Sequence, residues 1–197
     1  MRRRSRAAAV AVALCLPLPA LAHPHVLIDS HIVLRFEAGK IVDLQMGWKF
    51  DAVYSGSLLQ DFDKNKDGKL SAQELAAMEQ DAFQDTAQYS YFTHARVDGK
   101  PLTWPKAEGF QVIAQKDGLI YAFRLRLPAP VDPRQQDFRL STYEETYYID
   151  IDFPNDGAVR LIGDGAEGCR ATMSPDLENT LLGGVVTPKK VEIACAP

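Results

Sequence analysis

Residues 26–50 read VLIDSHIVLRFEAGKIVDLQMGWKF, and this stretch decides the fold because its apolar side chains recur at every second position. In its first half the even-numbered positions are apolar apart from Ser30. A period of two over this length is typical of a strand with one buried face. Residues 38–40 have the composition of a turn, and residues 41–50 resume as a second strand. The sequence therefore predicts a β-hairpin.

The apolar period changes after the hairpin. Over residues 52–62 the apolar positions recur at helical spacing, and a polar loop follows. Leu75, Met78 and Phe83 then resume the helical period. We therefore expect a helix-loop-helix insertion over about residues 51–90.

The chain returns to short apolar segments after Tyr91, separated by turns rich in glycine, proline and aspartate. These segments are FQVIAQ, LIYAFRLRL, FRLSTY, TYYIDIDF and AVRLIG. Strands at this spacing indicate an antiparallel sandwich or a barrel-like sheet. The predicted fold class is α+β, a mostly antiparallel β-sandwich-like domain over residues 23–197 with a helical insertion.

The first 22 residues have the pattern of a secretory signal peptide. A basic start, MRRRSR, precedes a short apolar run that ends at the small-residue sequence Ala20-Leu21-Ala22. About ten apolar residues precede Pro17, too few to cross a bilayer, which argues against a membrane anchor. We therefore predict that residues 1–22 are a cleaved signal peptide and that the mature chain does not insert into a membrane.

Cleavage would make the chain strongly acidic. The formal charge of −4 becomes −8 when the four arginines of the leader are removed. Such a charge argues against nucleic acid as a partner. The mature chain keeps two cysteines, Cys169 and Cys195. An even pair in an exported chain predicts a disulfide, and the alternative is a metal site with two thiolates.

The loop of the insertion, residues 63–74, reads DKNKDGKLSAQE and matches the template of an EF-hand calcium loop. Ca²⁺ takes six to eight oxygen ligands, and a short loop supplies them from alternating positions. Gly68 occupies the sixth position, where the chain turns sharply. The predicted ligands are the side chains of Asp63, Asn65, Asp67 and Glu74 and the backbone carbonyl of Lys69.

An alternative for this loop is a turn between helices that holds no ion. Ser71 and Glu74 also have the spacing of a capping box, which such a turn would share. That alternative does not require acidic or amide side chains in alternation before Gly68. A lone EF-hand favours a structural role over a sensor role, because sensor EF-hands work in pairs. Weak affinity would suffice outside the cytoplasm.

Two histidines at the predicted mature start form a candidate transition-metal site. After cleavage His23 carries a free α-amine, and His25 lies roughly 7 Å further along an extended chain. Neutral imidazole suits Zn²⁺, Ni²⁺ and Co²⁺. Pro24 has no N–H, which excludes the square-planar amino-terminal site that needs a deprotonated amide. His31 is about 20 Å along the strand and out of reach. The alternative is a solvated terminus with incidental histidines.

The combination of these features resembles one family. A signal peptide, a mature start at HPHVLID, the segment WKFD (Trp48 to Asp51), the EF-type loop and the segment YEETYYIDIDF are its marks. The family is often labelled as the periplasmic component of an ABC-type transport system. Its members are typically encoded beside nickel/cobalt-type permeases, and some are implicated in zinc uptake. The resemblance implies a periplasmic protein that binds or passes on a transition metal at His23 and His25, with an inner-membrane metal permease as partner.

These observations favour a non-enzymatic metal-binding accessory protein of transition-metal (Zn/Ni/Co) transport, stabilised by one Ca²⁺. One alternative is a calcium-stabilised scaffold or adhesion module without a transition-metal role. The other is a copper oxidoreductase with an amino-terminal histidine ligand. The sequence shows no set of serine, histidine and aspartate residues typical of a hydrolase and no nucleophilic cysteine, so we expect no catalytic residues.

Overall fold

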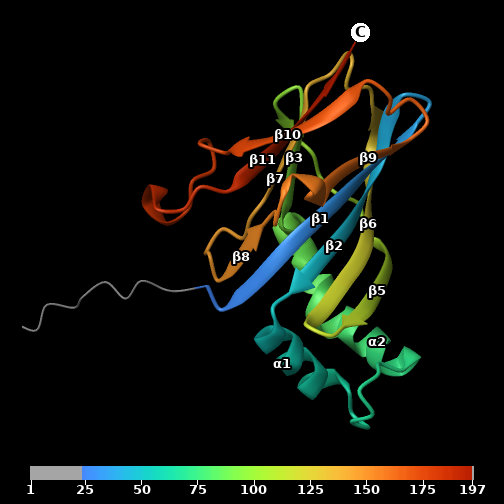
Figure 1. Ribbon diagram of the computed structural model, residues 1–197, viewed down its shortest axis with the longest axis vertical. Helices are drawn as coiled ribbons and strands as arrows, with labels where there is room; N and C mark the ends of the chain where they lie inside the picture. The colour runs from blue at the N-terminus through green and yellow to red at the C-terminus, as the bar shows by residue number, and fades with distance from the viewer. Residues whose placement is uncertain (1–23, 197) are drawn as a thin grey trace, which may run out of the picture.

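The computed structural model describes residues 24–196 and arranges them as two β-sheets with a helical insertion at one end of the first sheet (Figure 1). The predicted signal peptide, residues 1–22, and His23 lie outside the described residues. The strands of the first sheet are β5 (Glu108–Gln115), β6 (Gly118–Val131), β2 (Lys40–Phe50), β1 (Val26–Glu37), β8 (Ile149–Asp152) and β9 (Val159–Gly163). The strands of the second sheet are β10 (Cys169–Pro175), β11 (Lys189–Cys195), β7 (Phe138–Thr142), β3 (Thr93–Val97) and β4 (Lys100–Pro101).

The predicted hairpin is confirmed. β1 and β2 pair antiparallel from Ile28 opposite Phe50 to Glu37 opposite Lys40. The even-numbered residues of β1 are buried, as the alternation requires. Ala38 and Gly39 form the turn with φ of 47° and 77°, as in the two-residue turns whose twist matches the strands.

The first sheet is mixed, because β8 and β9 pair with β1 in parallel. Val26 lies opposite Ile149, and Ile32 lies opposite Val159, so the two short strands share one edge of the long β1. The remaining pairings between named strands are antiparallel, and the mostly antiparallel α+β class is confirmed.

One hydrophobic core draws on both sheets and on the insertion. Trp48 of β2 is 1% exposed and packs edge-on against Phe123 of β6, with ring centroids 4.7 Å apart. Phe83 and Phe92, which follow the second helix, also pack against Trp48. Leu140 and its buried neighbours bring the second sheet into the same cluster. The insertion is therefore attached to the core by its aromatic residues.

The insertion begins and ends close to the predicted positions. It consists of α1 (Ala52–Phe62), α2 (Ala72–Met78), a π-helical turn η1 (Glu79–Phe83) and a 3₁₀ segment η2 (Gln84–Phe92). Asp51 caps α1, because its carboxylate accepts hydrogen bonds from the amides of Val53 and Tyr54. The second oxygen of Asp51 accepts from the amide of Leu27 at 3.0 Å. This residue therefore connects the helix start to β1.

Two further features bear on the predicted compartment. Cys169 and Cys195 lie opposite each other on β10 and β11 and form a disulfide, as predicted. Disulfides are typical of oxidising compartments. Within residues 24–196, helices with the length and apolarity for a bilayer crossing are absent.

Candidate functional site

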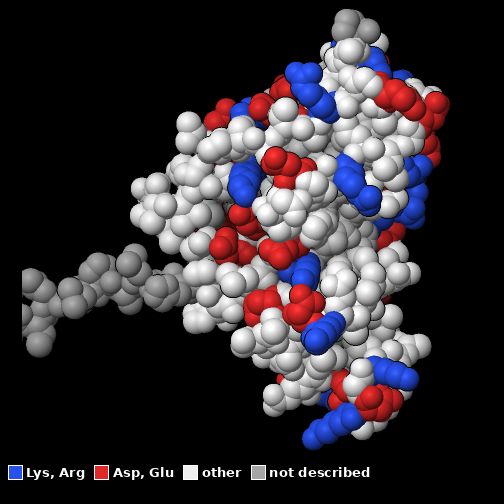
Figure 2. Space-filling model, viewed as in Figure 1, with Lys and Arg blue, Asp and Glu red and all other residues white. Residues whose placement is uncertain are grey.

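The loop between α1 and α2 lies at the tip of the insertion (Figure 1), where Figure 2 shows basic and acidic side chains close together. Asp63 ends α1, and its carboxylate turns into the loop. Its two oxygens accept hydrogen bonds from the amides of Asp67 at 3.2 Å and Gly68 at 2.8 Å. Gly68 has a φ of +77°, which non-glycine residues rarely adopt. The glycine thus folds the loop back over the first predicted ligand.

Glu74 closes the other end of the loop. It stands in the first turn of α2, and its carboxylate accepts from the amides of Lys64 at 2.8 Å and Ser71 at 2.9 Å. Ser71 in turn accepts from the Glu74 amide, which completes the capping box. Hydrogen bonds from Ser71 and then from the Lys64 amide lower the pKa of Glu74. The carboxylate is therefore held in its charged form across the two ends of the loop.

The two middle ligand candidates are exposed and bond within the loop. The Asn65 side-chain oxygen accepts from the Asp67 amide at 3.0 Å, and its nitrogen donates to Asp67 at 3.1 Å. The other Asp67 oxygen accepts from the amide of Lys69 at 2.8 Å. All four predicted side-chain ligands thus belong to one hydrogen-bonded loop.

The carboxylates of this loop form no direct ion pairs within the described residues, although Lys64, Lys66 and Lys69 balance their formal charge. Asp63 and Glu74 are only 8% and 9% exposed, shielded by the loop itself. In the part of the chain that the structure describes, neither forms an ion pair with lysine or arginine. Shielded carboxylates normally pair with a cation or coordinate a metal. Here the direct hydrogen-bond partners of both carboxylates are backbone amides.

The donor set of the loop fits calcium. Three carboxylates, one amide oxygen and one carbonyl are hard oxygen ligands of the kind Ca²⁺ prefers. Between residues 24 and 196 no three histidine, cysteine, aspartate or glutamate side chains converge as in an assembled metal centre. In this loop each carboxylate accepts hydrogen bonds from backbone amides. Calcium binding would exchange these amide bonds for the ion, and it stays a prediction.

His25 lies at the start of β1 and is exposed. Its ring stacks on Tyr148 with centroids 4.8 Å apart, and its amide donates to the Tyr148 carbonyl at 2.9 Å. His31 lies further along the same strand, opposite Gly47 of β2. His23, the other predicted ligand, is outside the described residues. The structure therefore leaves the amino-terminal metal site as a prediction.

His94, which sequence could not place, lies on β3 in the second sheet. Its ring stacks on Tyr143 at 4.0 Å, and its Nε2 lies 3.2 Å from the Tyr143 carbonyl. Burial lowers the pKa of His94. Because a carbonyl can only accept, the neutral ring carries its proton on Nε2.

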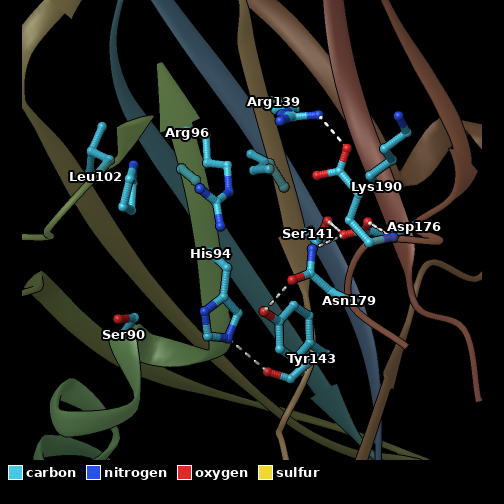
Figure 3. Close-up of a pocket in the computed structure, with 14 residues that line it drawn as sticks. Ser90, His94, Arg96, Leu102, Arg139, Ser141, Tyr143, Asp176, Asn179 and Lys190 are labelled. Atoms are coloured by element: carbon cyan, nitrogen blue, oxygen red, sulfur yellow. Dashed lines mark hydrogen bonds and ion pairs between the residues drawn. The ribbon is translucent and has the colours of Figure 1, made fainter. Parts of the chain in front are cut away.

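His94 lines a cavity that sequence reasoning missed (Figure 3). The charged residues that line this cavity come from β3, β7 and β11 and from the loop after β10. The alternation of polar and apolar residues in THARV and FRLST does indicate two strands that each have one polar face. The residues that meet there are far apart in sequence, so the pattern alone could not reveal the cavity.

Comparisons with known proteins supply a family and no activity. The family described as "Protein of unknown function (DUF1007)" matches residues 8–183. An "Uncharacterized 15.5 kDa protein in trpE 3'region" of Spirochaeta aurantia is 28% identical over 142 residues, which are 71% of this chain and 99% of that protein. An "Uncharacterized protein" of Haemophilus influenzae is 27% identical over 139 residues, 71% of this chain and 66% of that protein.

Proposed function

This chain belongs to the DUF1007 family, a family of unknown function, and we propose that it is an exported metal-binding protein that holds one Ca²⁺ in the loop of residues 63–74. The observation that carries the proposal is the pair of shielded carboxylates of Asp63 and Glu74, which form no ion pair with a lysine or arginine of residues 24–196. An ion between them would replace the amide bonds as the compensation of their charge.

Calcium in this loop would serve a structural role. Asp63 is the C-cap of α1, and Glu74 is in the first turn of α2, so one ion bound to both would fix the two helices relative to each other. The chain after α2 leads into Phe83, which packs on Trp48 in the core. Calcium would therefore stabilise the insertion against the sheet, and we expect no signalling role from a single loop.

Nuclear magnetic resonance of the ¹⁵N-labelled mature chain tests this placement. The amides of Lys64 and Gly68 donate to Glu74 and Asp63 in the structure, so calcium should shift their signals most strongly. The amide of Cys169, which donates to a backbone carbonyl in a turn remote from the loop in sequence, serves as the control. Calcium shifts spread evenly over the chain, or absent from residues 63–74, would contradict the proposal.

We further propose that the protein is an accessory to transition-metal transport in the periplasm, with an inner-membrane metal permease as partner. The resemblance to permease-associated proteins supports this role. The exposure of His25 at the start of β1 supports it too, because the ring is accessible to an ion. His23, with its free amine after cleavage, would share the metal.

Titration of correctly processed protein with Zn²⁺, Ni²⁺ and Co²⁺ tests the transition-metal role. His25→Ala should weaken binding roughly tenfold or more, because loss of a group that merely orients a ligand already costs about 10- to 100-fold. His31→Ala, an exposed histidine on the same strand, is the matched control and should bind as the wild type does. Equal binding by the two variants, or no binding at all, would leave a calcium-stabilised scaffold as the function.

A further inference from the structure

A cavity of about 130 Å³ lies on the second sheet, on the face turned away from the core (Figure 3). Ala95, Leu140 and Val191 point into the core from β3, β7 and β11. The residues next to them in sequence therefore point the other way, toward the cavity. The loop after β10, which contains Asp176 and Asn179, forms another wall of the cavity.

The strand register arranges the polar side chains on this face of the sheet in rows. His94, Ser141 and Lys190 lie opposite one another in one row across the three strands. The next row places Arg96 of β3 directly opposite Arg139 of β7, and Arg139 directly opposite Glu192 of β11. Like charges in directly opposed positions destabilise a sheet. An anion near the two arginines would relieve this repulsion, and Glu192 forms its ion pair with Lys190 at 3.1 Å.

Among the described residues, carboxylates of the protein pair with only one of the two arginines. Arg139 forms an ion pair with Glu178 at 3.3 Å, but its Nε is buried and has no hydrogen-bond partner among the described residues. Arg96 donates to the Gly99 carbonyl at 3.0 Å and forms no ion pair within residues 24–196. One guanidinium thus lacks a carboxylate, and the other has an unpaired buried donor.

The remaining acid of the cavity is already engaged. Asp176 is 3% exposed and accepts from Ser141 Oγ at 2.5 Å and from the Asn179 side chain at 2.7 Å. Burial alone would raise the pKa of Asp176, but hydrogen bonds from Ser141 and Asn179 lower it below its usual value. Asp176 therefore holds the cavity wall together through these hydrogen bonds, and among the described residues it forms no ion pair with either arginine.

A strained backbone segment borders the cavity. Ser90, which lines it, has a φ of 56°, and Tyr91 and Phe92 follow with φ of 49° each. Three consecutive non-glycine residues in this conformation cost energy, and such strain concentrates at functional sites. This segment leads through Thr93 into His94, so the strained residues lie next to the first strand of the cavity.

We propose that this cavity binds a small oxyanion, a carboxylate or a phosphate, through the guanidinium groups of Arg96 and Arg139. Guanidinium groups form paired, charge-assisted hydrogen bonds with both kinds of anion. The volume is close to that of a cavity of about 150 Å³ that holds benzene, so the ligand has only a few heavy atoms.

Calorimetric titration of the mature protein with inorganic phosphate, acetate and succinate in calcium-free buffer tests the proposal. Saturable binding of at least one of these anions is expected, with chloride at equal ionic strength as the reference. Arg96→Gln and Arg139→Gln should each raise the dissociation constant roughly tenfold or more. Arg96→Lys keeps the charge but loses the planar guanidinium group, which can donate to two oxygens of one anion, and should also weaken binding. Arg160→Gln removes an exposed charge from β9 and should leave binding unchanged.

A second readout does not depend on finding the natural ligand. Without anion, Arg96→Gln should melt at the same temperature as the wild type or higher, because it removes one of two opposed charges. The proposal is overturned if none of the three anions binds saturably. It is also overturned if Arg160→Gln weakens binding as much as Arg96→Gln does, since the anion would then respond to net charge alone.

Discussion

Calcium should raise the melting temperature of the chelator-treated mature protein. A ligand that binds only the folded state stabilises it by an amount set by the ratio of its concentration to its dissociation constant. Extracellular calcium modules have dissociation constants of roughly 0.1 to 1 mM. At about 10 mM free calcium the stabilisation is therefore about 1.4 to 2.7 kcal/mol. For a domain of this size, this stabilisation corresponds to a rise in melting temperature of about 3 to 11 °C.

Glu74→Gln isolates the contribution of the loop. Glutamine also serves at this position of a capping box, so the helix start is kept. It has one oxygen in place of two and no charge, so it cannot close the site with two ligand atoms. The calcium-dependent rise should disappear in this variant. Asp81→Asn makes the same charge change at an exposed position beyond α2 and should respond to calcium as the wild type does.

Differential scanning calorimetry with calcium and with magnesium checks this prediction. Magnesium demands near-ideal octahedral geometry and keeps several waters, so it should produce a much smaller rise. An equal rise with both ions would refute the reasoning, because it would indicate screening of charge and not a built site. A calcium response in Glu74→Gln equal to that of the wild type would refute it as well.

Three further predictions concern the fold. Asp51→Ala removes the cap of α1 and the bond to β1, and should cost about 0.5 to 2 kcal/mol in urea denaturation. Replacing both Cys169 and Cys195 by serine opens a link across 26 positions and should cost about 3 kcal/mol in the same assay, while an unchanged midpoint would count against the disulfide. Burial lowers the pKa of His94, so the unfolded chain binds the proton more tightly, and stability should fall as pH drops below about 6.5. His94→Phe keeps the ring but cannot titrate, and its urea midpoint should fall less over that range.

Local patterns predicted the elements whose buried faces are set by their own sequence. The alternation in residues 26–50 gave the hairpin, because one face of β1 contacts the core along its whole length. The change of period at Asp51 gave the start of α1, where the aspartate caps the helix. The cysteine pair was predictable from the expected export and the even number, since the two residues have no competing partner once the predicted signal peptide is removed.

Contacts between distant segments could not be predicted in this way. The parallel pairing of β8 and β9 with β1 depends on how the chain returns from β7 of the second sheet through residues 143–148. The two opposed arginines belong to strands about forty residues apart, and each alone is an ordinary polar position of a half-buried strand. The amino-terminal site also stays a prediction, because one of its two proposed ligands, His23, lies outside the described residues.

Equilibrium dialysis against calcium, with elemental analysis of the protein, tests the central claim most directly. At calcium concentrations roughly ten times the dissociation constant, the wild type should hold about 0.9 calcium per chain. The double variant Asp63→Asn/Glu74→Gln should hold almost none, because it removes the ligands at both ends of the loop. A wild type that retains no more calcium than the double variant would contradict the account.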